Sequence, residues 1–311
     1  MRWVLRGVGV LGLLVVAWCC VTAWPAIIHG HPLYGVLLVL TVALSVFALG
    51  KSFRPRNGMG RWRQAFGVVG VVVFVAWIAL MAWLRPFPAV EPALAAMESG
   101  PTVTVVESPT QIVMAPASGE STTGVVFQPG AKVEARAYAA VLRPLAEAGY
   151  TVVIPKQPLG IAFLATNAFE SARDANPQIT DWFVGGHSLG GTVAAMDAEA
   201  HSADAKSPVK GLILYASYPA SDMSSTLSAK VLSVSGTKDG LATPADIEAS
   251  RANLPKDAIF TPIDGAVHAF FGDYGPQPGD GTPTVSHDSA RQLIQRNTLI
   301  FMSGVQLNAD G

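Results

Sequence analysis

A serine between glycines is the position in this sequence best suited to nucleophilic chemistry. Residues 186–190 (GHSLG) fit the pattern G-x-S-x-G, in which a sharp turn from a strand into a helix presents the serine hydroxyl. The pattern alone is weak, because 30 of the 311 residues are glycine. Its context strengthens it, since a short apolar run (WFVG, 182–185) precedes it and a helical pattern rich in small residues (GGTVAAM, 190–196) follows. The sequence therefore predicts Ser188 as a nucleophile.

The glycines of the motif have a steric reason. At such a turn, residues two before and two after the serine must be small, and Gly186 and Gly190 satisfy this. The next residue, Gly191, would let the helix approach the sheet closely. The backbone N–H of Leu189, at the start of the helix, would then point to where a tetrahedral oxyanion forms.

A serine hydroxyl needs a base at neutral pH, and the base needs a group that orients it. His268 follows the expected strand 259–263, and Asp239 follows the expected strand 231–235. Both residues therefore lie at the carboxyl ends of strands, at the same sheet edge as Ser188. We expect Ser188 to be the nucleophile, His268 the base and Asp239 the orienting acid.

Each of these assignments has an alternative. Asp264, four residues before His268, is the second candidate for the acid, and Asp246 is also near in sequence. Ser188 could be an ordinary turn residue, and His268 a structural loop histidine.

The loop 129–133 (PGAKV), after the expected strand 124–128, is the predicted source of a second oxyanion donor. We expect that donor to be the N–H of Ala131, with Gly130 bending the backbone. Lys132 could approach an anionic substrate, but a solvated lysine is the more common outcome.

Two further segments flank the predicted site. Residues 157–165 (QPLGIAFLA) are apolar and could form a wall of an acyl pocket or simply pack in the core. Residues 272–281 are rich in glycine and acids and could cover the cleft, but they lack the ligand spacing of a calcium loop. His29 and His31 have no third ligand nearby, so no metal site is expected.

The elements that must position these residues alternate between strands and helices. Short apolar runs predict strands at 102–107, 111–115, 124–128, 151–155, 182–185, 211–215, 231–235 and 259–263. Helical patterns occupy 134–148, 189–200, 245–253 and 286–302. Continuous apolar runs are typical of strands buried on both faces of a parallel sheet. The sequence predicts a three-layer α/β fold with a mostly parallel sheet over residues 102–311.

The N-terminal part differs sharply in composition. Residues 1–90 hold eight Lys and Arg but no Asp or Glu, whereas residues 91–311 hold thirteen basic and twenty-two acidic residues. The basic part is apolar and the larger part is acidic, so a nucleic-acid partner is not expected. Cys19 and Cys20 are adjacent in an apolar run, which excludes a disulfide framework.

Three uncharged stretches at about 7–28, 32–50 and 65–84 predict transmembrane helices within a membrane region 1–85. The basic residues cluster at the N-terminus and in 51–63, so these segments are expected in the cytoplasm and everything after Arg85 outside it. A rival interpretation makes the first stretch a signal peptide cleaved after 21–23 (VTA). Residues 86–101 contain several prolines and predict an unpacked tether.

Over about residues 124–305 the chain resembles the α/β-hydrolase superfamily, in particular small serine esterases akin to dienelactone hydrolases. The resemblance rests on PGAKV, GHSLGG, SGTKDG and GAVHAFFGDYG. It implies the order nucleophile, acid and base for Ser188, Asp239 and His268, with no metal or organic cofactor. Dienelactone hydrolases carry a cysteine nucleophile, so their substrate is not implied here. The loop 129–133 also lacks the HGGG of many lipases and esterases.

These observations predict a membrane-anchored serine hydrolase that cleaves a small-molecule carboxylic ester or thioester through an acyl-enzyme outside the cytoplasm. An amidase or peptidase of the same fold is one alternative. A catalytically silent binding module on a membrane scaffold is another.

Overall fold

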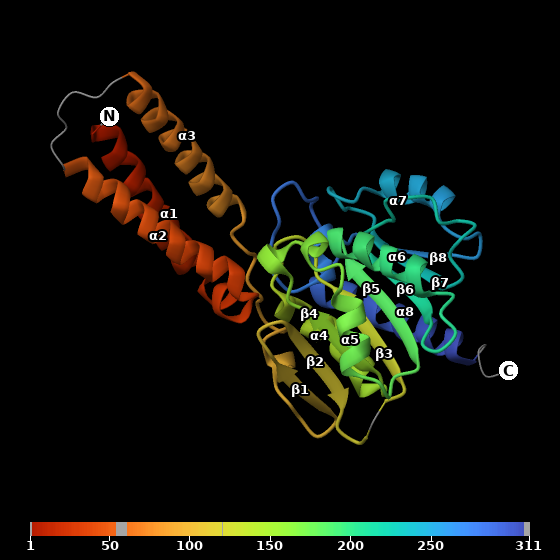
Figure 1. Cartoon of the computed structure of the whole chain (residues 1–311). Coiled ribbons are helices and arrows are strands. Elements are labelled where there is room, and N and C mark those ends of the chain that lie inside the picture. Colours follow the sequence, from red (N-terminus) through yellow and green to blue (C-terminus); the bar gives the residue numbers. More distant parts are fainter. Residues whose placement is uncertain (1, 54–60, 120, 308–311) are drawn as a thin grey trace. The chain divides into compact units, whose positions relative to one another are not determined.

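A computed structural model describes residues 2–53, 61–119 and 121–307 of the protein, without the side chains of Arg61 and Arg63. The chain forms two compact units, Met1–Pro86 and Phe87–Gly311 (Figure 1). Arg54 and Arg56, which belong to the predicted basic loop, lie outside the described residues.

The first unit consists of three long helices, α1 (Arg2–His29), α2 (Pro32–Phe53) and α3 (Arg61–Trp83). Each is long and apolar enough to cross a membrane, which agrees with the three predicted stretches. Helix α1 departs from helical geometry at Ala23, two residues before Pro25, because proline interrupts the helical hydrogen-bond ladder.

Small and polar residues join these helices. A Cβ on Gly9 of α1 would lie only 2.9 Å from the backbone oxygen of Ser45 of α2, so glycine at this position lets the two backbones approach closely. Tyr34 donates its hydroxyl hydrogen to the carbonyl oxygen of Met81 at 2.8 Å, which ties α2 to α3. Small and hydrogen-bonding groups therefore contribute to the contacts between these helices, together with buried apolar side chains such as Ile78 and Met81.

The second unit is built on an eight-stranded sheet in the order β1-β2-β4-β3-β5-β6-β7-β8. The strands are β1 (Val103–Glu107), β2 (Gln111–Pro116), β3 (Thr123–Gln128), β4 (Thr151–Pro155), β5 (Asp181–His187), β6 (Val209–Tyr215), β7 (Lys230–Gly236) and β8 (Ile259–Ile263). The pairs β1/β2 and β2/β4 are antiparallel and the others are parallel. Every strand expected from the sequence is present.

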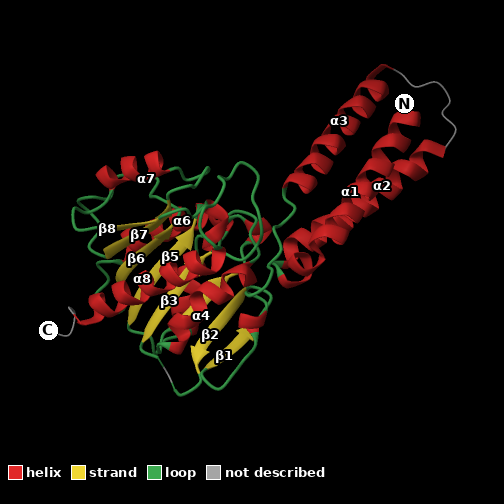
Figure 2. Cartoon of the chain, turned by 180° about the vertical axis from the view of Figure 1, so that it is seen from behind, coloured by secondary structure: helices red, strands yellow, loops and turns green. Residues whose placement is uncertain are grey.

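Helices cover both faces of this sheet, which makes the predicted three layers (Figure 2). The helices are α4 (Ala139–Glu147), α5 (Ala168–Ala175), α6 (Leu189–His201), α7 (Pro244–Ser250) and α8 (His287–Leu307). Successive side chains of a strand point to opposite faces of the sheet, so they pack in two separate cores. Phe127 and Val125 pack in the core with α4 and α8, whereas Val126 and Val153 pack in the core with α5 and α6.

Three segments differ from the sequence expectations. Helix α5 was not predicted, since only two of its side chains, Phe169 and Ala172, are buried. The expected helix 134–148 opens with a 3-10 turn (Ala135–Tyr138). Residues 157–165 form two short turns with Phe163 and Leu164 exposed, so those two side chains do not pack in the core.

The segment expected to be an unpacked tether is packed, so that expectation is wrong. Phe87 N–H donates to Lys132 O at 2.8 Å, and Ala89 N–H donates to the Glu134 carboxylate at 2.8 Å. Val90 N–H donates to the carbonyl oxygen of Asp273 at 2.9 Å. The donors in these contacts are backbone N–H groups of non-proline residues, so the prolines of the segment do not prevent them. The second unit therefore begins at about Phe87 rather than at residue 102.

Candidate active site

Ser188 occupies the sharp turn between β5 and α6. Its backbone has φ 52° and ψ −126°, a conformation that costs a non-glycine residue about 1–3 kcal/mol. Two hydrogen bonds hold the turn: Ser188 N–H donates to Tyr215 O at 3.0 Å, and Ser217 Oγ donates to Ser188 O at 2.6 Å. Ser188 itself is only half-buried, so a substrate can reach it.

The glycines of the motif are required by space, as the sequence predicted. A Cβ on Gly186 would lie 2.4 Å from the carbonyl carbon of Gly190, and a Cβ on Gly190 would lie 2.1 Å from Gln128 O. A Cβ on Gly191 would lie 2.4 Å from Ser217 Oγ. These approaches press the first turn of α6 against the ends of β3 and β6.

Asp239 and His268 are brought together at the ends of β7 and β8. Their side chains are 0% and 2% exposed, and His268 Nδ1 lies 2.9 Å from Asp239 Oδ2. The other carboxylate oxygen, Oδ1, accepts hydrogen bonds from the N–H groups of Leu241 and Ala242, each at 2.8 Å. The carboxylate is thus fixed by three donors, and its orientation toward the imidazole is set by the backbone.

The alternative acid, Asp264, points elsewhere. It is exposed, and its Oδ1 accepts a hydrogen bond from Thr237 Oγ1 at 3.0 Å. Asp246 is engaged in the N-terminal cap of α7, where it bonds Thr243. In this geometry Asp239 is the acid that contacts His268.

His268 lies against His187, the residue that precedes the serine. The rings of His187 and His268 lie 4.5 Å apart between centroids. Within the described part of the chain, no hydrogen bond joins the Ser188 hydroxyl to His268. A hydrogen bond between a nucleophile and its base often forms only when substrate binds, so its absence is compatible with the roles predicted for Ser188 and His268.

Two backbone N–H groups are available near the serine. The N–H of Leu189 belongs to the first turn of α6 and has no acceptor inside the helix. In the loop after β3, Gly130 N–H donates to Tyr138 Oη at 2.9 Å and Lys132 N–H donates to Gly160 O at 2.7 Å. Ala131 lies between them, and its N–H makes no hydrogen bond among the residues that the structure describes. Within the described residues, the fold itself therefore leaves the N–H groups of Leu189 and Ala131 without an acceptor.

The loop carrying Ala131 is clamped by side chains that the sequence did not single out. Tyr138 Oη accepts from Gly130 N–H and lies 2.8 Å from His187 Nδ1. Burial, and then the nearby His268, lower the pKa of His187 well below its usual range, so its neutral ring can accept the Tyr138 hydroxyl hydrogen. From the other side, Gln157 Nε2 donates to Pro129 O at 3.2 Å.

Asp280, which was not predicted as a site residue, links the loop that carries Asp239 to the loop that carries His268. Asp280 Oδ1 accepts from Gly240 N–H at 3.2 Å and from His268 N–H at 3.1 Å, while Oδ2 accepts from Ala269 N–H at 2.8 Å. The glycine-rich segment 272–281 therefore supports the backbones of the two loops that carry Asp239 and His268. No spacing in the sequence signals this contact, which joins positions 40 residues apart.

Two further possibilities considered from the sequence were an anion-binding Lys132 and a metal site. Lys132 has a positive φ of 63°, and its Nζ lies 5.5 Å from the centroid of the Phe87 ring. Among the described residues, no group of three or more His, Cys, Asp or Glu is arranged to hold a metal ion.

Residues 124–292, just over half of the chain, match the model of a family described as "Alpha/beta hydrolase family". No curated protein matches the sequence at a significant level.

Many solved structures are similar to the chain. A thermophilic esterase from Thermogutta terrifontis is 15% identical, with 66% of this chain and 92% of that chain covered and a TM-score of 0.46. A candidate dienelactone hydrolase from Klebsiella pneumoniae is 15% identical, with 65% and 96% covered and a TM-score of 0.49. Est1E from Butyrivibrio proteoclasticus is 14% identical, with 65% and 99% covered and a TM-score of 0.45.

Proposed function

The chain belongs to the alpha/beta hydrolase family, and from this premise we propose that it is a membrane-anchored serine hydrolase of carboxylic esters or thioesters. The observation that carries the proposal is the buried 2.9 Å contact between His268 Nδ1 and Asp239 Oδ2, at the sheet edge where Ser188 occupies its turn. A buried imidazole held by a carboxylate is the arrangement that activates a serine hydroxyl.

In the proposed mechanism, Asp239 holds the Nδ1 hydrogen of His268, which leaves Nε2 as the proton acceptor. As Ser188 Oγ attacks the carbonyl carbon, its proton passes to His268 Nε2. The imidazolium then protonates the departing alkoxide or thiolate, which leaves an acyl group on Ser188. Water, deprotonated by the same histidine, releases the acid and restores the serine.

The negative charge on the tetrahedral oxygen would be stabilised by the N–H groups of Leu189 and Ala131. Each such donor typically contributes about 10²–10³ in turnover, because it is already oriented before the charge develops. The clamp on the loop, made by Tyr138 and Gln157, favours this role since it fixes the loop without using the N–H of Ala131.

We propose that the acyl part of the substrate contacts the apolar turns 158–164. Phe163 and Leu164 are 46% and 54% exposed there. Gly160 in the same segment accepts from Lys132 N–H, next to Ala131. Exposed apolar side chains beside an oxyanion loop suit a hydrocarbon portion of a substrate.

The membrane part of the proposal rests on α1, α2 and α3, whose length and composition suit membrane spans. Lys and Arg near the N-terminus and in residues 51–63 favour a cytoplasmic position for those segments. Three spans would place the second unit, Phe87–Gly311, on the side of the membrane opposite the cytoplasm. This unit is called the hydrolase unit from here on. Protease accessibility of the hydrolase unit in sealed cells would test this orientation.

The activity is tested by treating the full-length protein with a fluorophosphonate and mapping the adduct by mass spectrometry. We expect one adduct per chain, on Ser188, and none in Ser188→Ala. A panel of ester, thioester and amide substrates with the same acyl chain then defines the bond cleaved. A correctly folded protein without an adduct at Ser188 would contradict the proposal.

A further inference from the structure

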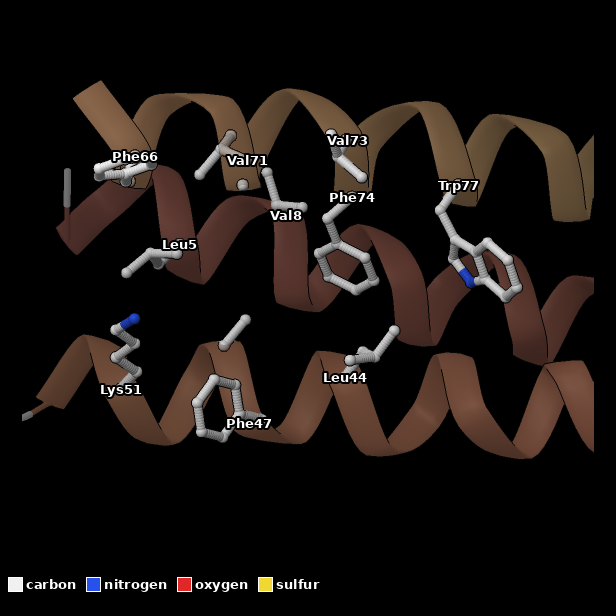
Figure 3. Close-up of a pocket in the computed structure, with 13 residues that line it drawn as sticks. Leu5, Val8, Leu44, Phe47, Lys51, Phe66, Val71, Val73, Phe74 and Trp77 are labelled. Carbon is white, nitrogen blue, oxygen red and sulfur yellow. The ribbon is translucent and has the colours of Figure 1, made fainter. Parts of the chain in front are cut away.

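The three helices of the first unit enclose an apolar groove of about 370 Å³, a volume within the range of ligand pockets (Figure 3). All three helices contribute to it. Its lining residues include Leu5 and Val8 of α1, Leu44 and Phe47 of α2, and Phe66, Gly70, Phe74 and Trp77 of α3. Among the lining residues whose side chains the structure describes, Lys51 of α2 is the charged one, and Figure 3 places it at the same end as Leu5 and Phe66.

The length of the groove matches one half of a bilayer. Its lining on α3 extends from Phe66 to Trp77, a distance of about 16 Å at 1.5 Å per residue. The hydrocarbon core of a membrane is about 30 Å thick, so an acyl chain in one leaflet spans about 15 Å. The groove is therefore as long as one lipid tail.

The far end of the groove is apolar in spite of its tryptophan. Trp77 Nε1–H donates to Thr41 Oγ1 at 2.9 Å, so the indole's only polar group is already bonded. The ring itself is left to contact hydrocarbon. This end fits the tail of a lipid rather than a polar group.

The end of the groove near Leu5 and Phe66 carries the positive charge of Lys51, and residues 1–90 contain no acidic side chain that could pair with it. Residues 1–90 contain no Asp or Glu, and Lys51 Nζ lies 5.8 Å from the centroid of the Phe47 ring. A second cation is close in the fold, since Arg6 Nε donates to Ser52 Oγ, one residue beyond Lys51, at 3.3 Å. An anionic group at this end would supply the missing counter-charge.

We propose that this groove binds one tail of an anionic glycerophospholipid, with the phosphate beside Lys51. The inference rests on the proposed insertion of α1, α2 and α3 in a membrane. The first unit, Met1–Pro86, is called the membrane unit from here on. The inference gives it a binding function beyond that of an anchor, at a site distinct from Ser188.

The test measures retained lipid by native mass spectrometry of the full-length protein. The protein is stripped of lipid in detergent and titrated with phosphatidylglycerol or phosphatidylcholine of identical tails. We expect one retained lipid per chain and a preference for phosphatidylglycerol of about fivefold, the contribution of one lysine near an anionic headgroup. Lys51→Gln should abolish the preference while leaving the tail site intact.

A second pair of variants tests the groove itself. Gly70 lines it and has no atom within 4 Å of a Cβ position, so Gly70→Leu should fill the groove and reduce the retention of both lipids at least tenfold. Gly7→Leu is the matched control, because Gly7 also has open space around it but does not line the groove. Unchanged retention in Gly70→Leu, or an unchanged preference in Lys51→Gln, would overturn the inference.

Failure of this inference can be distinguished from failure of the proposed function. Protein released from membranes by alkaline carbonate would contradict the membrane anchor. Protein that resists carbonate and reacts with a fluorophosphonate, yet retains no lipid selectively, would contradict the lipid site alone.

Discussion

The two units of the chain place their apolar side chains in opposite ways. In the membrane unit Leu14 and Phe47 are 61% and 66% exposed, while the polar side chains of Thr41 and Ser45 are fully buried between helices. In the hydrolase unit the strand residues Phe127, Val153 and Leu214 are at most 1% exposed. Similar apolar residues are thus arranged in two ways: those of the first unit form an exposed apolar surface, which would suit surrounding hydrocarbon, and those of the second unit enclose a core.

The units also differ in the charges they bury. The membrane unit has cations but no carboxylates, so it cannot form internal ion pairs with acids. The hydrolase unit buries the carboxylates of Asp239, Asp197 and Asp273. Buried carboxylates need donors or cations nearby, and this unit supplies backbone N–H groups for Asp239 and Arg291 for Asp273. We therefore expect the residues that carry out hydrolysis to lie entirely in the second unit.

The most severe way to break this comparison is to remove the nucleophile. Ser188→Ala should lower turnover by about 10⁶, since loss of a triad serine leaves only the oxyanion donors and substrate binding. The change should leave lipid retention by the membrane unit unchanged. Hydrolysis by the purified variant, measured against a short-chain ester, checks this, and more than a hundredth of the wild-type rate would refute the assignment.

The next largest effect concerns the acid. Asp239→Asn should lower turnover by about 10⁴, because an amide that accepts at one atom only favours the wrong tautomer of His268. Asp264→Asn is the control and should cost little, since its carboxylate is exposed and bonds Thr237 instead. Steady-state rates of the two variants decide between the acids; the reverse order would assign the role to Asp264.

A smaller effect is expected from the carboxylate that supports both loops. Asp280→Asn replaces an acceptor oxygen by a donor where the N–H groups of Gly240, His268 and Ala269 converge. A displacement of the histidine by about 1 Å can cost 10²-fold, so we expect a loss in kcat of about that size with KM nearly unchanged. Asp288→Asn, in the same unit but 77% exposed and paired with Arg291, serves as the control.

A purely structural role of Asp280 would give a different result. It would lower the thermal stability of the unit while leaving the kcat of the remaining folded enzyme, and its pH profile, as in the wild type. A positioning role should instead shift the pH dependence of kcat/KM, because the contact between His268 and Asp239 is altered.

The smallest predicted effect is on stability. Burial, opposed by the nearby amide of Gln128 and reinforced by the charge of Glu170, raises the pKa of Asp197 from 3.8 to about 7. The folded state therefore holds this proton more tightly than the unfolded state, and stability falls as pH rises from about 4 to 7. Asp197→Asn should be more stable than the wild type at pH 8, on the order of 1–4 kcal/mol.

Urea unfolding of the hydrolase unit at several pH values measures this difference. The gap between Asp197→Asn and the wild type should narrow as the pH is lowered and disappear near pH 4, because the wild-type carboxyl is then neutral in both states. A gap that does not depend on pH would mean that the carboxyl is ionised in the folded protein as readily as in the unfolded one.

The strands of the hydrolase unit could be predicted from the sequence for a physical reason. Strands buried on both faces consist of nearly continuous apolar residues, so 124–128 and 211–215 could be recognised without any knowledge of their neighbours. Asp239 and His268 could be placed at one sheet edge because each follows an expected strand, β7 for Asp239 and β8 for His268, although β8 is a partly exposed edge strand. Helix α5 escaped prediction since it is only eight residues long and buries only two of its side chains.

Contacts between distant segments could not be predicted. Asp280 acts on residues 240, 268 and 269 through backbone N–H groups, which every residue except proline carries, so no residue type marks the partners. The packed segment after Pro86 was missed because the backbone N–H groups that bond Lys132, Glu134 and Asp273 give no signal in residue type. Its core residues, Ala89 and Ala93, are small and form no apolar run.

That packed segment also fixes where the chain should be cut to separate the two units. A fragment of residues 87–311 retains Phe87, Ala89 and Val90 with their hydrogen bonds, whereas a fragment that begins at residue 95 loses them. The longer fragment has no cysteine and no helix that could span a membrane among its described residues. Because the longer fragment keeps these hydrogen bonds, we expect it to fold as a monodisperse protein and the shorter one to be less stable.

The central claim, a complete serine hydrolase joined to a separate membrane unit, is tested most directly by the rate of fluorophosphonate labelling of Ser188. The second-order rate constant is measured for fragment 87–311 in buffer and for the full-length protein in detergent. We predict equal rates within about threefold, with the adduct on Ser188 in both, because the groups proposed to activate this serine all lie after residue 128. A folded fragment that is not labelled, while the full-length protein reacts, would show that the membrane helices complete the active site.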